Sequence, residues 1–168
     1  QHQWKFSTTS GGTYSNVTGG IGSNTPEYMS SGLSAGTYYF VMLTTCTNNA
    51  LSASSNEATV VVNAVPSVTA SAQNTLLCAG QAINLTANSS AGALYSWSGP
   101  SGFNSSLQSP TLAGASNGAS GIYSVSATVN NCSSLPVSVT ISVSQVTLNL
   151  SASQQTLCLG TTATLSLN

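Results

Sequence analysis

Few side chains in this 168-residue chain could carry out acid–base or metal chemistry. The charged side chains are those of Lys5, Glu27 and Glu57, and the only histidine is His2. A serine hydrolase needs a base and an orienting acid, so His2 at the start of the chain would have to meet one of two glutamates. A calcium site needs several carboxylates, and the chain has no Asp. We therefore predict no catalytic residue, no metal site and no cofactor.

The cysteines are the other reactive groups. They are Cys46, Cys78, Cys132 and Cys158. They form no CxxC pair and have no histidine nearby, so they do not read as a zinc site. Single cysteines at matching places in a repeated sequence predict disulfides, and these predict an oxidising location outside the cytoplasm. The alternative is four buried free thiols, since Cys packs well as a small hydrophobic residue.

The net charge of −1 limits the possible partners. A chain with so little charge has no field to attract nucleic acid or an anionic membrane surface. No apolar run approaches the ~18 residues that a membrane helix needs. Low charge also removes the usual electrostatic protection against self-association, so assembly with copies of itself is a possible purpose. We predict no nucleic-acid partner and no membrane insertion.

Two segments of the chain repeat each other eighty residues apart. The sequence SAQNTLLCAG at 71–80 returns as SASQQTLCLG at 151–160. A second echo relates residues 36–46 to residues 121–132, each with Gly-x-Tyr followed by a cysteine. Repetition at a fixed spacing is the signature of a tandem array of domains.

The elements that carry these residues are predicted to be β-strands. Apolar residues at Val137, Val139, Ile141 and Val143 alternate with Ser and Thr, as in a half-buried strand. Short strands between Gly-, Ser- and Asn-rich turns predict an all-β antiparallel sandwich with essentially no helix. The strands A, B, C, C′ or D, E, F and G are expected near 67–73, 81–87, 94–98, 103–108, 110–113, 122–130 and 135–143.

Four aromatic residues are the expected core positions. Trp97 on strand C would fill the space between the two sheets. Tyr123 opens strand F and occupies the place of a tyrosine corner, a tyrosine that bonds to the backbone a few residues upstream. Trp4 and Tyr38 are the expected counterparts in the preceding unit.

The sequence resembles a known family at several places. The strings LYSWSGPSGF at 94–103, GIY at 121–123 and NNC at 130–132 are similar to the immunoglobulin-like and PKD-like repeats of Bacteroidota cell-surface adhesins, and so are Trp4 and residues 36–46. The resemblance implies tandem domains in large adhesins or gliding-motility proteins exported by the type IX secretion system, at the cell surface. In antibody domains the second cysteine follows the corner tyrosine by two residues, whereas here it follows eight or nine later.

The predicted domains are cut in an unusual place. Residues 1–64 read as strands C to G of a partial domain, 65–144 as a complete domain, and 145–168 as strands A and B of another partial domain. The two partial domains complement each other. The chain is therefore either a window from a longer tandem protein or a filament subunit whose last two strands complete the first domain of the next copy.

The disulfide pairing depends on strand direction. Cys78 precedes strand B and Cys132 follows strand F, and these strands run the same way in a sandwich of this order. The two sulfurs would then lie at opposite ends, roughly 20–25 Å apart at ~3.3 Å per residue, whereas a disulfide tolerates only about 7 Å between Cα atoms. Bridges between neighbouring repeats are therefore favoured over Cys78–Cys132, although a displaced strand A would restore that bond.

These observations favour a structural function. The leading hypothesis is a stalk segment of an extracellular adhesin or surface filament, with neighbouring repeats or copies of itself as partners, head to tail. The alternative is a carbohydrate-binding module that binds surface glycans. Its aromatic surface would be formed by Tyr14, Tyr28, Tyr95 and Phe103, for which core packing or turn anchoring is the competing interpretation.

Overall fold

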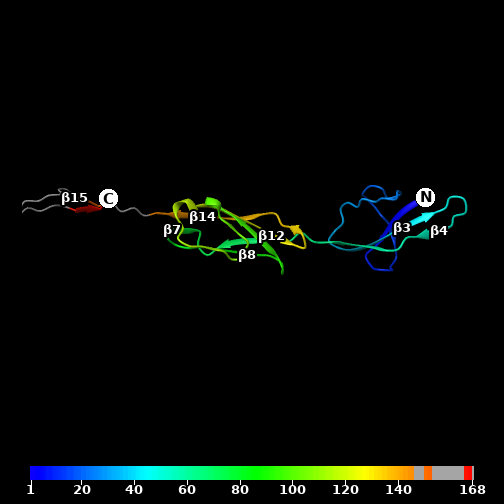
Figure 1. The fold of residues 1–168 in the computed structure, drawn as a ribbon, viewed down its shortest axis with the longest axis horizontal. Helices are drawn as coiled ribbons and strands as arrows, with labels where there is room; N and C mark the ends of the chain where they lie inside the picture. The colour runs from blue at the N-terminus through cyan, green and yellow to red at the C-terminus, as the bar shows by residue number, and fades with distance from the viewer. Residues whose placement is uncertain (146–149, 153–164, 168) are drawn as a thin grey trace, which may run out of the picture. The chain divides into compact units, whose positions relative to one another are not determined.

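The regular secondary structure of the described residues is almost entirely β-strand. The computed structural model describes residues 1–145, 150–152 and 165–167 and divides the chain into two compact units, Gln1–Val65 and Pro66–Asn168 (Figure 1). The described residues contain no α-helix, only the short 3-10 turns η1 (Pro100–Gly102) and η2 (Asn117–Ala119). The predicted all-β fold class is confirmed. Cys158 lies outside the described residues.

Residues 66–144 of the second unit form two sheets, the larger one with β12 and β14 and the smaller one with β8, which are labelled in Figure 1. The larger sheet has the order β10-β9-β12-β14-β7, and β13 also pairs with β12. Its strands are β7 (Leu76–Cys78), β9 (Leu94–Ser98), β10 (Asn104–Ser105), β12 (Gly121–Val129), β13 (Cys132–Ser133) and β14 (Val137–Ser144). The smaller sheet has the order β11-β8-β6, with strands β6 (Thr69–Ala72), β8 (Ile83–Asn88) and β11 (Thr111–Leu112). The seven strands expected in this part of the chain are all present.

One strand was not expected. After β6 pairs with β8 in the smaller sheet, the chain crosses over and β7 pairs in parallel with β14, with Cys78 opposite Ser144. Backbone bonds flank this pairing, from the Ser142 N–H to the Thr75 carbonyl and from the Ala79 N–H to the Ser144 carbonyl, each 2.8 Å long. The beginning of the second unit is thus tied directly to the end of β14.

The core of the second unit lies between its two sheets. Alternate residues of β8 face it, since Ile83, Leu85 and Ala87 are at most 1% exposed. From the larger sheet, Trp97 is 1% exposed and Tyr123 is fully buried. Other members of the same cluster are Val68, Leu77, Ala115, Ala119, Val125, Ala127, Ile141 and Val143. The period-two pattern of the sequence therefore gives one continuous apolar layer.

In the first unit all strands belong to a single sheet. The order is β2-β1-β3-β4, and β5 also pairs with β3. The strands are β1 (His2–Ser7), β2 (Ser15–Asn16), β3 (Gly36–Thr45), β4 (Ser52–Ser54) and β5 (Ala58–Val62). Residues 1–65 thus form one five-stranded sheet.

The strand register corrects the expected role of Trp4. In the second unit Trp97 lies opposite Val125. Val125 follows the corner Tyr123 by two residues. In the first unit the equivalent position, opposite Phe40, is taken by Phe6, and Trp4 pairs with Met42 instead. Trp4 and Tyr38 are also only half-buried, because no second sheet covers them within residues 1–65.

The strand pair near the end of the chain repeats an earlier pair. Strand β15 (Leu150–Ala152) pairs antiparallel with β16 (Leu165–Leu167), with Ala152 opposite Leu165. In the second unit β6 pairs with β8 in the same sense, with Ala72 opposite Leu85. Each residue of the later pair stands eighty positions after its counterpart. The sequence echo is therefore also an echo in strand register.

Candidate functional site

The structure places the few acid–base residues with separate partners. The His2 ring nitrogen Nδ1 lies 3.1 Å from the Thr44 hydroxyl. The carboxylate of Glu57 instead accepts hydrogen bonds from the Tyr14 hydroxyl, the Ser10 hydroxyl and the Gly11 N–H. The imidazole and this carboxylate are therefore not brought together as a hydrolase would need. Among the described residues there is no group of three or more potential metal ligands.

Glu57 is the acceptor of a small hydrogen-bond network in the first unit. Its bond from the Tyr14 hydroxyl, with help from the N–H of Gly11 and the hydroxyl of Ser10, lowers the pKa of Glu57 below its ordinary value. The same bond raises the pKa of Tyr14. These contacts fasten the turn at residues 10–14 to the start of β5, and no local sequence pattern signals them because the partners lie more than forty residues apart.

The cysteines lie at strand ends. Cys46 and Cys78 are exposed free thiols, and Cys132 is half-buried. Cys46 follows β3 in the first unit, and Cys132 follows β12 in the second. Cys78 lies at the other end of the second unit, opposite Ser144.

The register of the larger sheet separates Cys78 from Cys132. Cys132 pairs with Val129, near the end of β12. Four residues earlier on β12, Val125 pairs with Val137, which begins β14. Cys78 lies beside the far end of β14. At ~3.3 Å per residue the two cysteines are on the order of 30 Å apart, well beyond the ~7 Å limit for Cα atoms joined by a disulfide. A bond between them would require this sheet to come apart.

Five aromatic side chains gather on one face of the first unit's sheet. We call this the aromatic face: Trp4 and Phe6 from β1, Tyr38 and Phe40 from β3, and Tyr28 from the connection between β2 and β3. Neighbouring ring centroids lie 6.1 to 6.4 Å apart. Such spacing is typical of interacting aromatic pairs. The sequence did not single out Phe6 or Phe40, although the alternation of β1 and β3 puts both on this face.

The aromatic face contains a hollow of about 210 Å³. Its lining residues are Trp4, Tyr28, Ser30, Phe40, Ala58 and Val60. The polar ends of two rings are already bonded to backbone, from Trp4 Nε1 to the Thr25 carbonyl at 2.9 Å and from the Tyr28 hydroxyl to the Gly19 carbonyl at 3.1 Å. Val60 remains 41% exposed. The face therefore offers mainly apolar and uncharged surface.

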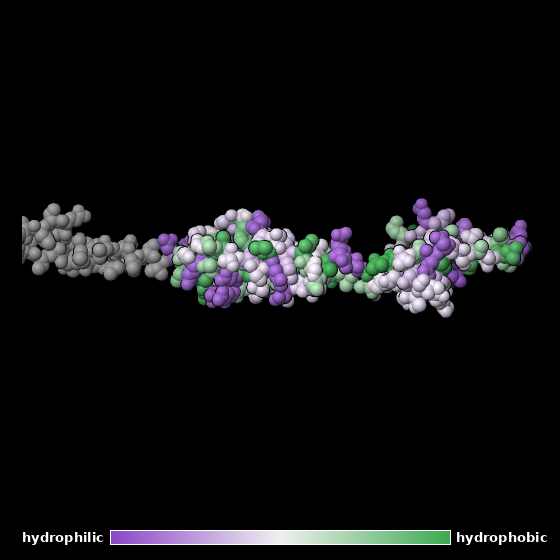
Figure 2. All heavy atoms as spheres, turned by 60° about the horizontal axis from the view of Figure 1, so that its bottom comes forward, coloured by the Kyte–Doolittle hydropathy of each residue, from purple (hydrophilic) through white to green (hydrophobic). Residues whose placement is uncertain are grey.

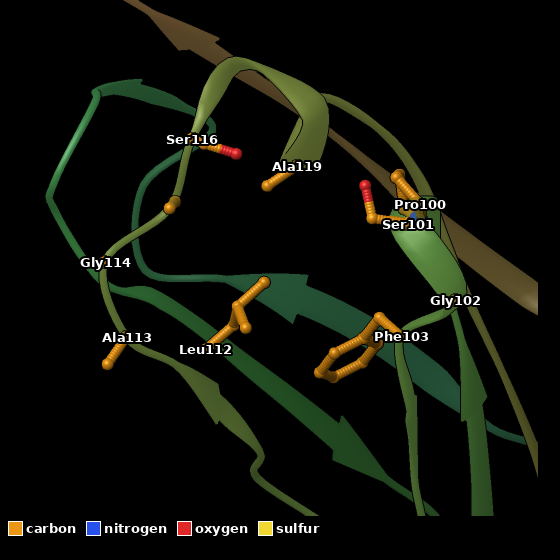
Figure 3. A pocket seen from close by; sticks show the side chains of 10 residues that line it. Pro100, Ser101, Gly102, Phe103, Leu112, Ala113, Gly114, Ser116 and Ala119 are labelled. Carbon is orange, nitrogen blue, oxygen red and sulfur yellow. The ribbon is translucent and has the colours of Figure 1, made fainter.

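A second hollow, of about 230 Å³, lies at one end of the second unit (Figure 3). It is formed where η1 and η2 approach the end of β11, and Figure 3 shows Phe103, Leu112 and Ala119 pointing into it. The Ser101 hydroxyl donates a 2.8 Å bond to the Gly118 carbonyl and joins the two turns. Phe103 packs edge-on against Tyr123. No charged residue lines this hollow, and its walls are parts of the sandwich itself.

The four aromatic residues proposed for glycan binding have separate environments. In the first unit Tyr14 donates its hydroxyl to Glu57, whereas Tyr28 stacks on Trp4. In the second unit Tyr95 is half-buried on β9, and Phe103 packs at the margin of the core. Of the four, only Tyr28 belongs to the aromatic face.

The two corner tyrosines make the same bond. The Tyr123 hydroxyl donates to the carbonyl of Ala119, four residues upstream, at 2.9 Å, and burial raises the pKa of Tyr123. The Tyr38 hydroxyl donates to the carbonyl of Ser34, also four residues upstream, at 3.0 Å. The second unit adds two packed sheets and a buried tryptophan, Trp97, on β9. The second unit is an immunoglobulin-like sandwich.

No protein-family model and no curated protein sequence matches the chain. Among solved structures, it is similar to an amphioxus IgVJ-C2 molecule, with 19% identity, a TM-score of 0.43, and coverage of 64% of this chain and 60% of that one. Murine CEACAM1b shows 18% identity, a TM-score of 0.38, and coverage of 65% and 58%. The three N-terminal domains of the outer capsid protein Hoc of bacteriophage RB49 show 12% identity, a TM-score of 0.40, and coverage of 99% and 58%.

The chain spans about three fifths of the length of these three solved chains. In the described part of the chain, no helix has the length and hydrophobicity needed to cross a bilayer. On the side shown in Figure 2, hydrophilic and hydrophobic residues are interspersed over the described surface.

Proposed function

We propose that this chain is a structural segment of an extracellular adhesin or surface filament, in which stacked immunoglobulin-like repeats provide reach and mechanical strength. The observation that carries the proposal is the recurrence of one strand pair: β15 and β16 repeat the register of β6 and β8 eighty residues later. Repeats of this kind extend a chain in one dimension. The near absence of charge suits a segment whose contacts are with neighbouring repeats.

The second unit has a strand arrangement suited to bearing load. A pull on its two ends acts on β6 and β7 at the beginning and on β14 at the end. Because β7 and β14 are parallel neighbours, that pull slides one strand along the other and loads their backbone bonds together. Breaking several bonds at once needs more force than opening them one after another.

We also propose that the cysteines fasten neighbouring repeats to each other. The separation of Cys78 and Cys132 within the second unit supports this proposal. In an end-to-end array, Cys78 would face the cysteine that follows strand F in the next repeat. Peptide mapping without reductant, on the full-length natural protein, should recover Cys78 joined to that next cysteine. Recovery of Cys78 joined to Cys132 of the same domain would overturn this pairing.

Pulling single molecules of the 168-residue chain by its ends tests the mechanical function. We expect a distinct unfolding event of the second unit at high force. An Ala79→Pro variant lacks the N–H that donates to Ser144, so its unfolding force should fall clearly.

The matched control for this experiment is Ala91→Pro. Residues 90–93 form a turn closed by a hydrogen bond from the Ala93 N–H to the Ser90 carbonyl. Gly92, the third residue of this turn, has a φ of 77°. Ala91 is the second residue, a position where proline is favoured. Its unfolding force should match that of the unmodified chain. Extension of the second unit without any force peak would contradict the structural function.

A second candidate function is carbohydrate binding, favoured by the stacked Trp4 and Tyr28 rings beside the hollow of the aromatic face. Sugars commonly pack on aromatic rings because their C–H groups are apolar. A glycan array probed with the 168-residue chain and with a Trp4→Ala variant distinguishes the two functions. Binding that is lost in the variant would support a carbohydrate-binding module, whereas a structural spacer binds no glycan.

A further inference from the structure

The connection between β11 and β12 contains the only Asn-Gly pair of the chain, Asn117-Gly118. The side-chain amide of an asparagine can be attacked by the backbone nitrogen of the next residue. Glycine hinders this attack least, because it has no Cβ and its backbone rotates most freely. The reaction is intramolecular, so proximity favours it over attack by an outside group. This pair therefore has the residue types that a spontaneous rearrangement of the backbone needs.

Both reacting groups are accessible in the folded second unit. Asn117 and Gly118 are exposed, and the residues that flank them, Ser116 and Ala119, are labelled in Figure 3. Within the described residues, neither the side-chain amide of Asn117 nor the N–H of Gly118 forms a hydrogen bond. The attacking nitrogen and the amide that it attacks therefore have no bond to break before they meet.

The turn η2 also favours loss of the proton from the Gly118 nitrogen. When that nitrogen loses its proton, the negative charge is shared with the Asn117 carbonyl oxygen. This oxygen accepts a 3.1 Å hydrogen bond from the Ser120 N–H, which stabilises charge on it. The Gly118 carbonyl accepts a 2.8 Å bond from the Ser101 hydroxyl. The hydrogen bonds of the turn thus surround the reacting peptide group and leave its nitrogen open.

Two other asparagines of the second unit show the contrast. Asn84 donates its side-chain amide to Gln73 at 2.8 Å, and Asn104 donates its amide to the Gly102 carbonyl at 2.9 Å. Each of these asparagines is followed by a residue with a side chain. Their amides are occupied and the following nitrogens are more hindered, so we expect both to stay intact where Asn117 reacts.

We propose that Asn117 is a site of spontaneous deamidation. The Gly118 nitrogen bonds to Cγ of Asn117, the side-chain nitrogen leaves as ammonia with the proton that Gly118 gives up, and a succinimide ring closes. Water then opens the ring at one of its two carbonyl carbons and yields aspartate or isoaspartate. Either product adds a carboxylate to residues 66–168, which contain no Asp, Glu, His, Lys or Arg, and takes the net charge of the chain from −1 to −2.

The isoaspartate product should loosen the tyrosine corner. In isoaspartate the backbone runs through the side chain, so the chain is one carbon longer at the first residue of η2. Two residues later, the Ala119 carbonyl accepts the hydrogen bond of Tyr123, and Ala119 itself is 6% exposed. A longer backbone displaces this residue from a closely packed place. Asn117 is thus an irreversible switch at one end of the second unit, and its action does not depend on the structural function proposed above.

Incubation of the folded 168-residue chain in neutral buffer at physiological temperature tests the site. We expect a more acidic species to accumulate with time in isoelectric focusing, and peptide mapping to place aspartate and isoaspartate at position 117. Gly118→Ala should slow the conversion several-fold. The added Cβ would lie 3.3 Å from Ser101 Oγ, a contact that a small shift of this side chain relieves. A synthetic peptide of residues 111–123 gives the rate of the same pair outside the fold.

Hydrogen exchange at the Val125 amide tests the effect on the tyrosine corner. The aged chain should exchange faster there than the fresh chain. Asn117→Asp is the matched control, because it adds the same charge with a normal backbone, and it should exchange more slowly than the aged chain.

Three results would overturn the proposal. The first is a folded chain that keeps Asn117 intact for as long as the synthetic peptide takes to convert. The second is equal conversion in Gly118→Ala, which would remove the role of the Asn-Gly pair. The third is an aged chain that carries isoaspartate at position 117 and still protects Val125 as well as the fresh chain does, which would remove the effect on the corner.

Discussion

Tyr38 and Tyr123 hold the same place in the two units of this chain, and each donates its hydroxyl to the carbonyl four residues upstream. Their surroundings differ. Tyr123 is fully buried between two sheets, whereas Tyr38 is half-buried on a single sheet. The sequence around each tyrosine is similar, so the difference comes from what covers the residue. The local strand frame forms in both units, but only the second unit has the opposing layer within its own residues.

The difference shows where the stability of such a repeat lies. Fully burying a large apolar side chain contributes ~1.5–3 kcal/mol, and the second unit does this for several residues on each sheet. The first unit has five aromatic residues on its aromatic face, but of these only Phe40, at 7% exposure, is buried. The second sheet, rather than the side chains of the first, therefore decides how much of this free energy is gained.

The largest effect is expected from removing the central aromatic residue of each unit. Trp97→Ala deletes a side chain that is 1% exposed, and loss of a buried Trp or Phe costs about 3–5 kcal/mol. Phe6→Ala removes the residue at the equivalent position of the open sheet and should cost about half as much or less, because water already reaches that face. Native-state hydrogen exchange at the Val125 and Phe40 amides reports on each unit separately. Equal losses in the two units would contradict the comparison.

A smaller effect is expected from the glycine that precedes each corner tyrosine. Gly121 has a φ of 142°, and an added Cβ would lie 2.7 Å from Pro100 Cγ, whereas a Cβ at Gly36 would meet only the Tyr38 ring at 3.8 Å. Gly121→Ala should therefore destabilise the second unit by about 2–4 kcal/mol through overpacking and backbone strain. Gly36→Ala is the matched control: Gly36 has a φ of 158°, so the substitution shares the backbone strain but not the clash, and it should cost less. The same exchange measurement tests this pair, and a greater loss for Gly36→Ala would show that the two corners are not equivalent.

The corner bonds themselves should differ in the same direction. Tyr123→Phe leaves the Ala119 carbonyl without its partner in a buried place, which costs about 1–3 kcal/mol. Tyr38→Phe affects an exposed bond to Ser34, where water can replace the hydroxyl, and should cost less than about 1 kcal/mol. Calorimetric unfolding of the two variants measures both values. A larger cost for Tyr38→Phe would mean that the first unit is covered in solution.

The sequence predicted much of the second unit because its pattern is regular. Alternation in β8, β12 and β14 marked the strands, and the Trp97 and Tyr123 positions followed from strand order. The switch of β7 to the larger sheet was missed, because Leu76 and Leu77 continue an apolar run that gives no sign of a change of sheet. Local pattern fixes which face a residue takes, but not which sheet its strand joins.

The candidate site was harder to predict. Trp4 and Phe6 lie on the same face of one strand, and a period of two cannot tell which of them meets Phe40. The register is set by pairing with β3, which is thirty residues away in the sequence. The bonds of Glu57 likewise join residues that are distant in the chain. The described structure supplies these pairings.

The smallest effect is expected from pH, and it separates the two units most cleanly. Both glutamates lie in the first unit, and residues 66–168 contain no Asp, Glu, His, Lys or Arg. The bonds from Tyr14, Gly11 and Ser10 hold the pKa of Glu57 below its ordinary value. When folding lowers the pKa of a carboxyl group, the charged carboxylate stabilises the fold at pH values above the pKa in the unfolded chain, roughly 4.3. This stability is lost as the pH falls through the pKa in the folded state. The first unit should therefore weaken slightly below about pH 4.3, while the second unit stays constant. Urea unfolding at several pH values between neutral and acidic, monitored by hydrogen exchange at the Phe40 and Val125 amides, measures the stability of each unit.

Glu57→Gln should remove the pH dependence of the first unit. Glu27→Gln, the matched change at the other carboxylate, should preserve it. An acid-sensitive second unit would mean that the two units do not unfold independently.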